Sequence, residues 1–573
     1  MIKKLLTLLT IFFFCLASEG QVTTPQFAIV INELVADPTP VAGLPDAEWL
    51  ELKNVSGLDI NLQGWRLGKP SGQSGPMPSY VIKADSFVIV CTGSAVAALS
   101  IFGPVIAVTS FPALANGGDL IYLKSPQGRT IHSVNYKDDW YKNELKRSGG
   151  WSLEMIDTKN PCSGFSNWAA SVDPKGGTPG RKNSVDAVNA DNLSPRLLRA
   201  FAADSLQIVL IFNESLDSLT SAATSNYTIS DGVSIVSATP LAFQFDHVQL
   251  RLATPLTRNK IYTVTAANSK DCSGNAISTS ANLAKVGLPE QIDRLDIIVN
   301  EILFNPRSSG TDFVELYNRS NKILNLRNAY IANRGTSGAV ASVTQLSTEN
   351  FLFFPGDFIV LTKDIAAVKN DFIFLNPDAF IELASLPSYN DDKGAVIVLN
   401  EQGRIIDEVN YSEKWHFKLI SNNEGISLER IDYSGVSGNS ENWHSAAANV
   451  NYGTPTYKNS QYRITDGVRG EVSISPAVFS PDNDGLDDFA TLQYVFPQAG
   501  YVANITIFDA AGRPVRYLQR NALSGASGFY RWDGLDEKNK KLPLGLYIIN
   551  TEIFNLEGKT KRFKNTIVLA RKN

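Results

Sequence analysis

The chain has 573 residues, a formal net charge of −5 and a sequence pI near 5.6. Hydrophobic residues make up 43% and charged residues 19%, which is typical of a globular chain and excludes a disordered one; this length allows about three to five domains. The acidic balance and the lack of a Lys/Arg run argue against nucleic acid or an anionic membrane surface as a partner.

The N-terminus has the three parts of a secretory signal peptide. Lys3 and Lys4 precede an apolar run from Leu5 to Ala17, and cleavage is expected after Gly20. The run is too short for a typical membrane span. A lipoprotein signal at Cys15 is the alternative, but bulky phenylalanines precede this cysteine. We therefore expect a mature chain that is secreted or held at the outer-membrane cell surface, with no transmembrane segment.

Three cysteines follow this leader: Cys91, Cys162 and Cys272. An odd number in a long chain argues against a disulfide framework as the feature that holds the protein together. Cys91 ends an apolar run and is expected to be a buried strand residue. The pairing state of the three thiols stays open at this point.

An internal repeat organises the chain: the segment from Ile29 to Ser184 recurs in diverged form from Ile297 to Ser460. Each copy opens with an apolar-Asn-Glu stretch and closes with Gly-Thr-Pro and Asn-Ser motifs. The separation between the starts of the two copies, from Ile29 to Ile297, is too large for the repeat of a solenoid. It indicates one domain type used twice. The matching stretches are 30–34 with 298–302, 48–54 with 312–318, 60–62 with 324–326, 134–136 with 409–411, 152–154 with 427–429, 177–179 with 453–455, and 183–184 with 459–460.

Short strands dominate each copy. Apolar stretches alternate with tight Gly turns, and this pattern predicts hairpins packed into β-sandwiches. Helix-like stretches are confined to 95–99 and 366–370. The strand-like runs that carry the prediction are 49–53, 87–91 and 120–123 in the first copy and 313–317, 358–361 and 396–399 in the second.

Three stretches of the first copy point to a family: the Val-Ile-Asn-Glu-Leu opening at 30–34, the strand Glu-Trp-Leu-Glu-Leu-Lys-Asn at 48–54, and Ile-Asn-Leu-Gln-Gly-Trp at 60–65. They resemble the lamin tail domain, an immunoglobulin-like β-sandwich found in nuclear lamins and in many secreted bacterial proteins. The second copy has Leu-Arg-Asn-Ala at 326–329 where the family has a Leu-x-Gly-Trp turn. Its assignment therefore depends on the repeat.

The stretch between the copies has strand-like runs of its own, for example 207–212 and 248–252, and a closing turn Asp-Cys-Ser-Gly-Asn at 271–275. It is similar to the bacterial Ig-like domains of surface-layer and adhesin-type proteins, which usually end in an Asp-x-x-Gly-Asn turn. The resemblance implies a separate Ig-like domain between the two copies.

The C-terminal segment, about 463–573, is a fourth unit that contains Ile-Thr-Ile-Phe-Asp at 505–509 and Leu-Pro-Leu-Gly-Leu-Tyr at 542–547. It resembles the C-terminal Ig-like modules of Bacteroidetes secreted and gliding-associated proteins, which implies the type IX export machinery as a partner. The predicted fold is all-β, with four tandem immunoglobulin-like β-sandwich domains after a signal peptide. The expected boundaries are 1–20 for the signal peptide, 21–187 for lamin tail domain 1, 188–290 for the bacterial Ig-like domain, 291–462 for lamin tail domain 2, and 463–573 for the C-terminal Ig-like sorting or hook-capping-like domain.

The Asp-Asn-Asp-Gly-Leu-Asp-Asp stretch at 482–488 is the clearest candidate for an ion site. Ca²⁺ takes several oxygen ligands, and alternate Asp and Asn residues around a Gly turn supply them. The candidate ligands are Asp482, Asp484 and Asp488, with the carbonyl of Leu486. The loop lacks the distal Glu of an EF-hand, so an Asx-rich turn is the alternative. Either role is structural, and Ca²⁺ is the one cofactor that the sequence suggests.

Recurring carboxylates are a second candidate feature. Paired carboxylates can act in acid–base chemistry, but a period of two residues places Glu48 and Glu51 on opposite faces of a strand, which favours a strand-edge or turn-capping role. Nucleophile-elbow, P-loop and dinucleotide motifs are absent from the sequence. We therefore predict no catalytic residues and no enzymatic activity. The recurring acids are Glu33, Glu48 and Glu51, matched by Glu301, Asp312 and Glu315.

Most tryptophans occupy recurring positions, which favours core packing. Trp140 and Trp415 lie beside charged residues and are the candidates for a ligand-binding surface, such as a sugar platform. The resulting prediction is a secreted or cell-surface protein, not an enzyme, that binds or scaffolds a cell-envelope protein or surface glycan. A carbohydrate-binding accessory or adhesin associated with a secreted hydrolase is the alternative.

Overall fold

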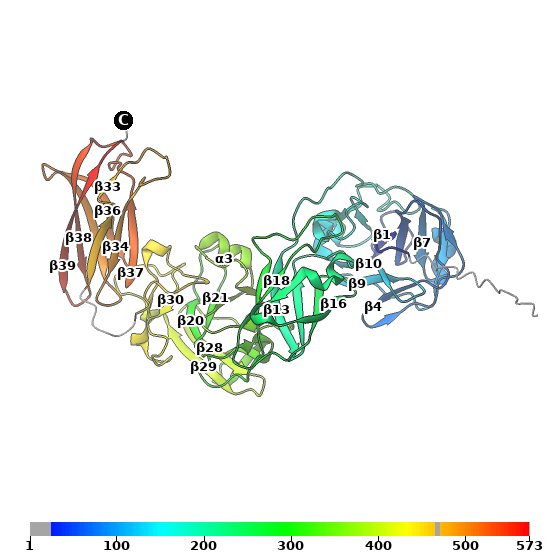
Figure 1. Ribbon diagram of the computed structural model, residues 1–573, viewed down its shortest axis with the longest axis horizontal. Helices are drawn as coiled ribbons and strands as arrows, with labels where there is room; N and C mark the ends of the chain where they lie inside the picture. The colour runs from blue at the N-terminus through cyan, green and yellow to red at the C-terminus, as the bar shows by residue number, and fades with distance from the viewer. Residues whose placement is uncertain (1–23, 464–469, 572–573) are drawn as a thin grey trace, which may run out of the picture. The chain divides into compact units, whose positions relative to one another are not determined.

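A computed structural model describes residues 24–463 and 470–571, so the expected signal peptide lies outside the described residues. The described residues form 39 β-strands and three short α-helices (Figure 1), and the fold is all-β and multidomain, as predicted. Helices α1 (Val96–Leu99) and α3 (Ile365–Asp371) lie where the sequence predicted them, whereas α2 (Glu144–Arg147) was not predicted. Among the described helices, none is long and apolar enough to cross a membrane.

The described chain divides into two compact units. The first ends its main segment at Leu198 and also includes Val209–Ala253 and Thr265–Leu283. The second contains Arg199–Ile208, Thr254–Val264 and the chain from Ala284 onward. The stretch between the repeated copies therefore contributes residues to both units.

The first copy consists of two sheets around one core, to which Leu50, Val88 and Ile121 contribute. All pairs in these sheets are antiparallel except β7 with β8. In spatial order the larger sheet contains β12 (Trp168–Ala170), β11 (Leu153–Met155), β1 (Ile29–Val35), β2 (Trp49–Asn54), β7 (Phe87–Cys91) and β8 (Val105–Ala107). The smaller sheet contains β10 (Thr130–Lys137), β9 (Gly118–Lys124), β4 (Arg66–Lys69) and β5 (Gly72–Gln73), and β3 (Ile60–Asn61) pairs with β6 (Val81–Ile82).

A β-bulge explains why the apolar-Asn-Glu stretch of β1 is buried along its whole length. The pairing of β1 with β2 shifts between Ile31 and Glu33, and all seven residues of β1 are buried. A bulge inserts one extra residue and redirects its side chain. Here the side chain of Asn32 donates to Glu51 Oε1 (3.0 Å) and to Asn183 Oδ1 (2.7 Å).

The second copy has the same strand order and the same bulge, now between Val299 and Glu301. Its one parallel pair, β26 with β27, occupies the corresponding place. The larger sheet contains β31 (Trp443–Ser445), β30 (Leu428–Arg430), β20 (Ile297–Leu303), β21 (Phe313–Asn318), β26 (Phe358–Thr362) and β27 (Phe380–Glu382). The smaller one contains β24 (Val340–Gln345), β23 (Ala329–Arg334), β28 (Lys393–Asn400) and β29 (Ile405–Ser412), and β22 (Leu324–Asn325) pairs with β25 (Leu352–Phe353).

Seven strands lie between the two copies, and β16 and β17 form an antiparallel hairpin among them. Pro240 pairs with Val248 in this hairpin, and its turn carries Phe243 and Gln244. The strands are β13 (Leu197–Asp204), β14 (Gln207–Phe212), β15 (Tyr227–Ile229), β16 (Ile235–Leu241), β17 (His247–Leu252), β18 (Tyr262–Ala266) and β19 (Leu283–Val286).

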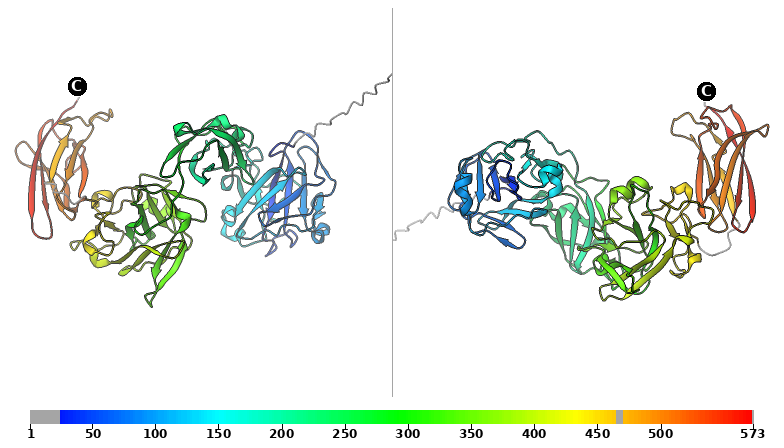
Figure 2. Two further views of the ribbon diagram at one scale, coloured as in Figure 1. Left: turned by 60° about the horizontal axis from the view of Figure 1, so that its bottom comes forward. Right: turned by 180° about the vertical axis from the view of Figure 1, so that it is seen from behind.

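The C-terminal strands form two sheets that bury Phe479, Trp532 and Ile549 in a shared core. Figure 2 shows their long strands at the orange and red end of the colour scale. One sheet contains β32 (Glu471–Ser475), β34 (Ala490–Val495) and β37 (Ser527–Trp532). The other contains β33 (Val478–Phe479), β39 (Thr560–Leu569), β38 (Gly545–Phe554), β35 (Val502–Asp509) and β36 (Pro514–Leu523).

Candidate functional site

A disulfide joins the first copy to the Ig-like stretch that follows it. Cys162 and Cys272 are bonded across a sequence separation of 110 residues, with their Cα atoms 6.1 Å apart. Cys91 is a free thiol buried in β7, as predicted. The pairing state that the sequence left open is therefore one disulfide and one free thiol, and a single bond does not amount to a disulfide framework. An odd cysteine count leaves one thiol unpaired but places no limit on the other two.

Aromatic packing supports the same junction. The ring of Tyr122 on β9 stacks on Phe243, with centroids 3.9 Å apart and planes 3° apart. The ammonium of Lys124 lies 4.9 Å from the centroid of each ring, and Ser133 Oγ donates to the carbonyl of Phe243 (2.8 Å). Offset-stacked rings and cation–π contacts stabilise an interface beyond the area that they bury. The hairpin turn between β16 and β17 is thus fixed against the first copy.

Three carboxylates converge beside the disulfide: Asp191, Glu214 and Asp271 each place an oxygen within 4.8 Å of the others. Burial raises the pKa of Glu214 to about 7, and the charges of Asp191 and Asp271 add to this effect. Asn275 donates to Asp271 Oδ2 (2.8 Å), and Ser163 donates to Asp191 Oδ2 (3.2 Å). Clustered carboxylate oxygens are the donor set that hard divalent cations prefer. The sequence identified the turn at 271–275 but gave no sign of this cluster.

Asp191 and Glu214 of this cluster line a cleft of about 440 Å³. Trp140 lines it but is only 7% exposed, because the turn Asp138–Tyr141 folds the indole toward Trp168 with ring centroids 6.1 Å apart. The expected surface position of Trp140 is therefore wrong, since its charged neighbours face outward while its own ring joins the core. Phe165, which is 52% exposed, is the accessible aromatic ring of this cleft.

Trp415 occupies the corresponding place in the second copy. It lies at the end of the turn Glu413–Trp415, with its ring centroid 6.3 Å from that of Trp443. The side chain is partly buried against the second core. The indole of Trp415 therefore does not form a flat, fully exposed surface for a sugar ring. Ligand binding by Trp140 or Trp415 stays a prediction.

The predicted ion loop brings its three carboxylates together. Asp482, Asp484 and Asp488 have oxygens within 4.8 Å of one another. Two of these carboxylates also accept backbone N–H groups: Asp488 from Asn483 (2.7 Å) and Gly485 (2.9 Å), and Asp484 from Leu486 (2.9 Å). This geometry thus fits both interpretations of the loop, an ion site and an Asx-rich turn. The Ca²⁺ site stays a prediction.

Each copy buries three glutamates beneath its closing segment, which we define as residues 177–185 in the first copy and 453–461 in the second. In the first copy these are Glu33, Glu51 and Glu154, all fully buried. The closing segment donates to each of them: Thr178 N to Glu33 Oε1 (2.7 Å), Gly180 N to Glu51 Oε2, and Ser184 Oγ to Glu154 Oε2 (2.8 Å). The glutamates thus hold the segment that leads into the next domain.

Burial sets the ionisation of these groups. It raises the pKa of Glu51 to about 8, although hydrogen bonds from Gly180 and Asn32 act in the opposite direction. Burial and the charges of Glu51 and Glu154 also raise the pKa of Glu33. Glu48 instead accepts the backbone N–H of Leu114 (2.9 Å). Glu51 caps the turn that contains Gly180, but it lies in the central strand β2 and not at a sheet edge, and the partner of Glu48 lies outside a turn.

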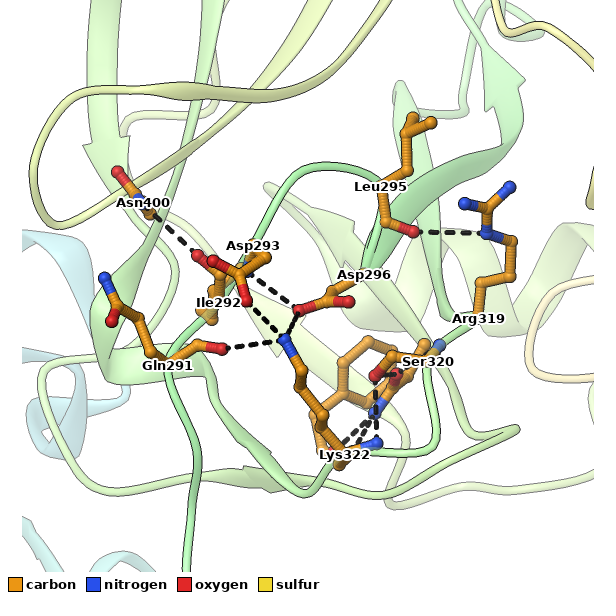
Figure 3. Close-up of polar contacts among 11 residues, drawn as sticks. Gln291, Ile292, Asp293, Leu295, Asp296, Arg319, Ser320, Lys322 and Asn400 are labelled. Carbon is orange, nitrogen blue, oxygen red and sulfur yellow. Dashed lines mark hydrogen bonds and ion pairs between the residues drawn. The ribbon is translucent and has the colours of Figure 1, made fainter.

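The second copy begins with an entry segment, residues 291–296, that polar side chains hold in place (Figure 3). Burial opposes the charge of Lys322, but hydrogen bonds to Asp293 and Asp296 outweigh this and raise the pKa of the lysine. The contacts are Lys322 Nζ with Asp293 Oδ2 (2.6 Å) and Asp296 Oδ2 (2.8 Å), Asn400 Nδ2 with the Ile292 carbonyl (3.3 Å), and Arg319 Nε with the Leu295 carbonyl (3.2 Å). Both ends of the second copy are thus fixed by polar contacts.

These features agree with the families that the chain matches. Residues 23–138 match the family model of the lamin tail domain. Residues 185–284 match that of the bacterial Ig-like domain. The chain therefore contains a lamin tail domain followed by a bacterial Ig-like domain, as the resemblance predicted, and neither is an enzyme family. No curated protein matches the chain.

Several solved structures share limited similarity with the chain. The N-terminal part of the bacterial S-layer protein SbsC is 17% identical over 29% of this chain and 45% of its own, with a TM-score of 0.16. A DUF4876 family protein from Bacteroides thetaiotaomicron is 12% identical over 36% of this chain and 83% of its own, with a TM-score of 0.17. A Ca²⁺-stabilized adhesin of an Antarctic bacterium is 10% identical over 95% and 99%, with a TM-score of 0.12. The chain thus spans less than half of the SbsC structure.

Proposed function

We propose that the protein is a non-enzymatic scaffold outside the cytoplasm, in which the lamin tail domain and the Ig-like domain form one fixed piece. The observation that carries this proposal is the Cys162–Cys272 disulfide between the two domains. Disulfides persist in oxidising compartments and are rare in the cytosol. Stacking of Tyr122 on Phe243 limits rotation at the same junction. A spacer that keeps its partners at a set distance needs such a junction.

A second lamin tail domain at 291–462 belongs to this proposal. The larger sheets of the two copies share one strand order, one parallel pair and one bulge before the buried glutamate. Three buried glutamates lie beneath each closing segment. These common features support one domain type used twice, with 188–290 as the Ig-like domain between them.

The C-terminal domain, 463–573, serves in this proposal as the signal for a type IX export machinery. Support comes from its two-sheet sandwich and from the sequence resemblance given above. A test is to compare the cellular location of the full-length protein with that of a chain truncated at residue 463. Retained protein in the truncated strain agrees with a sorting role, and unchanged surface delivery rejects it.

Glycan binding is a second candidate function, favoured by the cleft beside the disulfide. Phe165 offers an exposed ring there, and Asn135 and Gln244 offer amide groups for sugar hydroxyls. Binding of the full-length protein to a glycan array, compared with Phe165→Ala, tests this role. A matched control is Phe489→Ala, which removes an exposed ring from the C-terminal domain. Equal binding by wild type and F165A excludes the cleft as the glycan site.

The scaffold proposal is tested by a distance measurement in the full-length protein. Spin labels are introduced as noncanonical amino acids at the exposed residues Ser100 and Thr239, one in each domain, so that the native thiols stay untouched. Pulsed EPR should give a narrow distance distribution that broadens when the disulfide is reduced. A broad distribution in the oxidised protein rejects a fixed junction.

A further inference from the structure

A single hydroxyl group joins two buried carboxyls in the second copy. Thr454 Oγ1 lies 3.1 Å from Glu301 Oε2 and 2.8 Å from Glu429 Oε1. A threonine hydroxyl has one hydrogen, and an ionised carboxylate only accepts hydrogen bonds. The hydroxyl can therefore donate to only one of the two groups. Hydrogen bonds to both groups require a proton on one of the two glutamates.

The remaining oxygens of the pair are already occupied by donors. Glu301 Oε1 accepts from Thr454 N (2.9 Å) and from the hydroxyl of Ser427. Glu429 Oε2 accepts from Ser460 Oγ and Gln461 N, both at 2.8 Å. Glu301 Oε2 and Glu429 Oε1, the oxygens that face Thr454, are thus the ones at which a shared proton would lie.

The buried cation that follows Glu429 in the chain, Arg430, is paired with Asp407 (3.2 Å). Among the described residues, neither carboxyl takes part in an ion pair, and both are fully buried. Unpaired buried carboxylates are costly, and protonation is the usual outcome. Titratable groups on the elements packed against the pair are Glu315 on β21, His444 on β31 opposite Glu429, Tyr433, and Tyr457 and Lys458 of the closing segment. Lys458 is exposed and lies over Tyr462, and burial lowers the pKa of His444.

The first copy repeats the arrangement. Thr178 Oγ1 lies 2.9 Å from Glu154 Oε1 and 3.4 Å from Glu33 Oε2. Ser152 Oγ donates to Glu33 Oε1 (2.6 Å), and Val185 N donates to Glu154 Oε2 (3.1 Å). The arrangement thus recurs in the first copy, with a longer contact between Thr178 and Glu33.

The closing segment connects this bridge to the next domain. In the second copy the carbonyl of Ser460 accepts the backbone N–H of Ala526 (2.8 Å), and the hydroxyl of Ser460 is bonded to Glu429. Gln461 Nε2 donates to the Ser524 carbonyl (3.4 Å). Ser460 therefore links Glu429 directly to a residue of the C-terminal domain, so a change in the protonation of Glu429 can affect this contact.

We propose that the glutamate pair of each copy holds one proton, and that loss of this proton with rising pH releases the closing segment from the sheet. Ionising both carboxyls leaves two acceptors facing one hydroxyl and two like charges close together in the protein interior. In the second copy the release also weakens the contact of Ser460 with Ala526. Each copy is thus a pH-sensitive clasp on the segment that leads to the following domain.

Substitution of Glu429 by glutamine provides a sharp test. The amide oxygen can accept from Ser460 and Gln461, while the amide nitrogen can donate to the Thr454 hydroxyl as the proposed acid does. Amide hydrogen exchange of residues 453–461 in the full-length wild type becomes faster with pH for chemical reasons alone. Once the proton is lost, the exchange rate should rise by about a further tenfold per pH unit. Glu429→Gln should abolish this extra dependence while it keeps the segment protected at neutral pH.

The control variant is Glu424→Gln, an exposed residue of the same unit, which should behave as the wild type. Infrared spectra of the unmodified protein at neutral pH provide a readout that needs no variant: they should contain a protonated carboxyl band that disappears at high pH. Absence of that band overturns the proposal. So does an E429Q protein whose segment loses protection at neutral pH or keeps the wild-type pH dependence.

Discussion

Removing the Cys162–Cys272 disulfide should destabilise the first unit by a measurable amount. The bond closes a loop with a sequence separation of 110 residues. The chain-entropy relation gives about 4.8 kcal/mol at 25 °C for a loop of this length. Residual contacts between domains in the open loop reduce this value, so we expect a loss of about 2–4 kcal/mol. Denaturant unfolding of Cys162→Ser/Cys272→Ser at equilibrium, followed against the wild type, measures the difference.

Reductant provides the internal control for this experiment. The wild type should lose stability when dithiothreitol is added, whereas the double variant should not respond. A Cys91→Ala variant keeps the disulfide and should stay sensitive to reductant, since Cys91 is a free thiol. Equal unfolding midpoints for the wild type and the double variant in the absence of reductant refute the reasoning.

Three further outcomes follow from the same contacts. The pKa of Glu51 is about 8 in the folded protein against an ordinary 4.5, so the folded state holds more protons between these values. The contribution of Glu51 to the free energy of unfolding is complete below pH 4.5 and falls by about 4–5 kcal/mol as the pH rises to 8. Glu51→Gln should therefore flatten the plot of this free energy against pH over that range. An unchanged slope contradicts this. Phe243→Ala should cost about 1–2 kcal/mol in the first unit by removing the stack on Tyr122, and an unaltered melting temperature counts against it. Asp484→Asn keeps an acceptor for Leu486 N but removes a charge; calorimetric titration should show Ca²⁺ affinity lowered by about tenfold, whereas no Ca²⁺ binding by the wild type leaves the loop as an Asx-rich turn.

Local patterns made much of the fold accessible from the sequence. Alternating apolar residues and Gly turns carry information about strands within a few residues, and the short helices at 95–99 and 366–370 were found in the same way. The buried position of Asn32 was not accessible. Alternation alone places Asn32 and Glu33 on opposite faces, and only the bulge in β1 buries both.

The junction features depend on contacts between distant residues, which local patterns do not contain. Cys162 and Cys272 are bonded across a sequence separation of 110 residues. Asp191, Glu214 and Asp271 likewise come together from three separate stretches of the chain. Trp140 illustrates the opposite error: its charged neighbours indicated the surface, but the turn at 138–141 folds its ring onto Trp168.

The most direct test of the scaffold account is differential alkylation of the protein on intact native cells, followed by mass spectrometry. A membrane-impermeant thiol reagent is applied first, and a second reagent is added after denaturation without reduction. The account predicts a linked peptide pair containing Cys162 and Cys272, with Cys91 labelled only after denaturation because it is buried. Free, alkylated Cys162 and Cys272 in the native protein would contradict it.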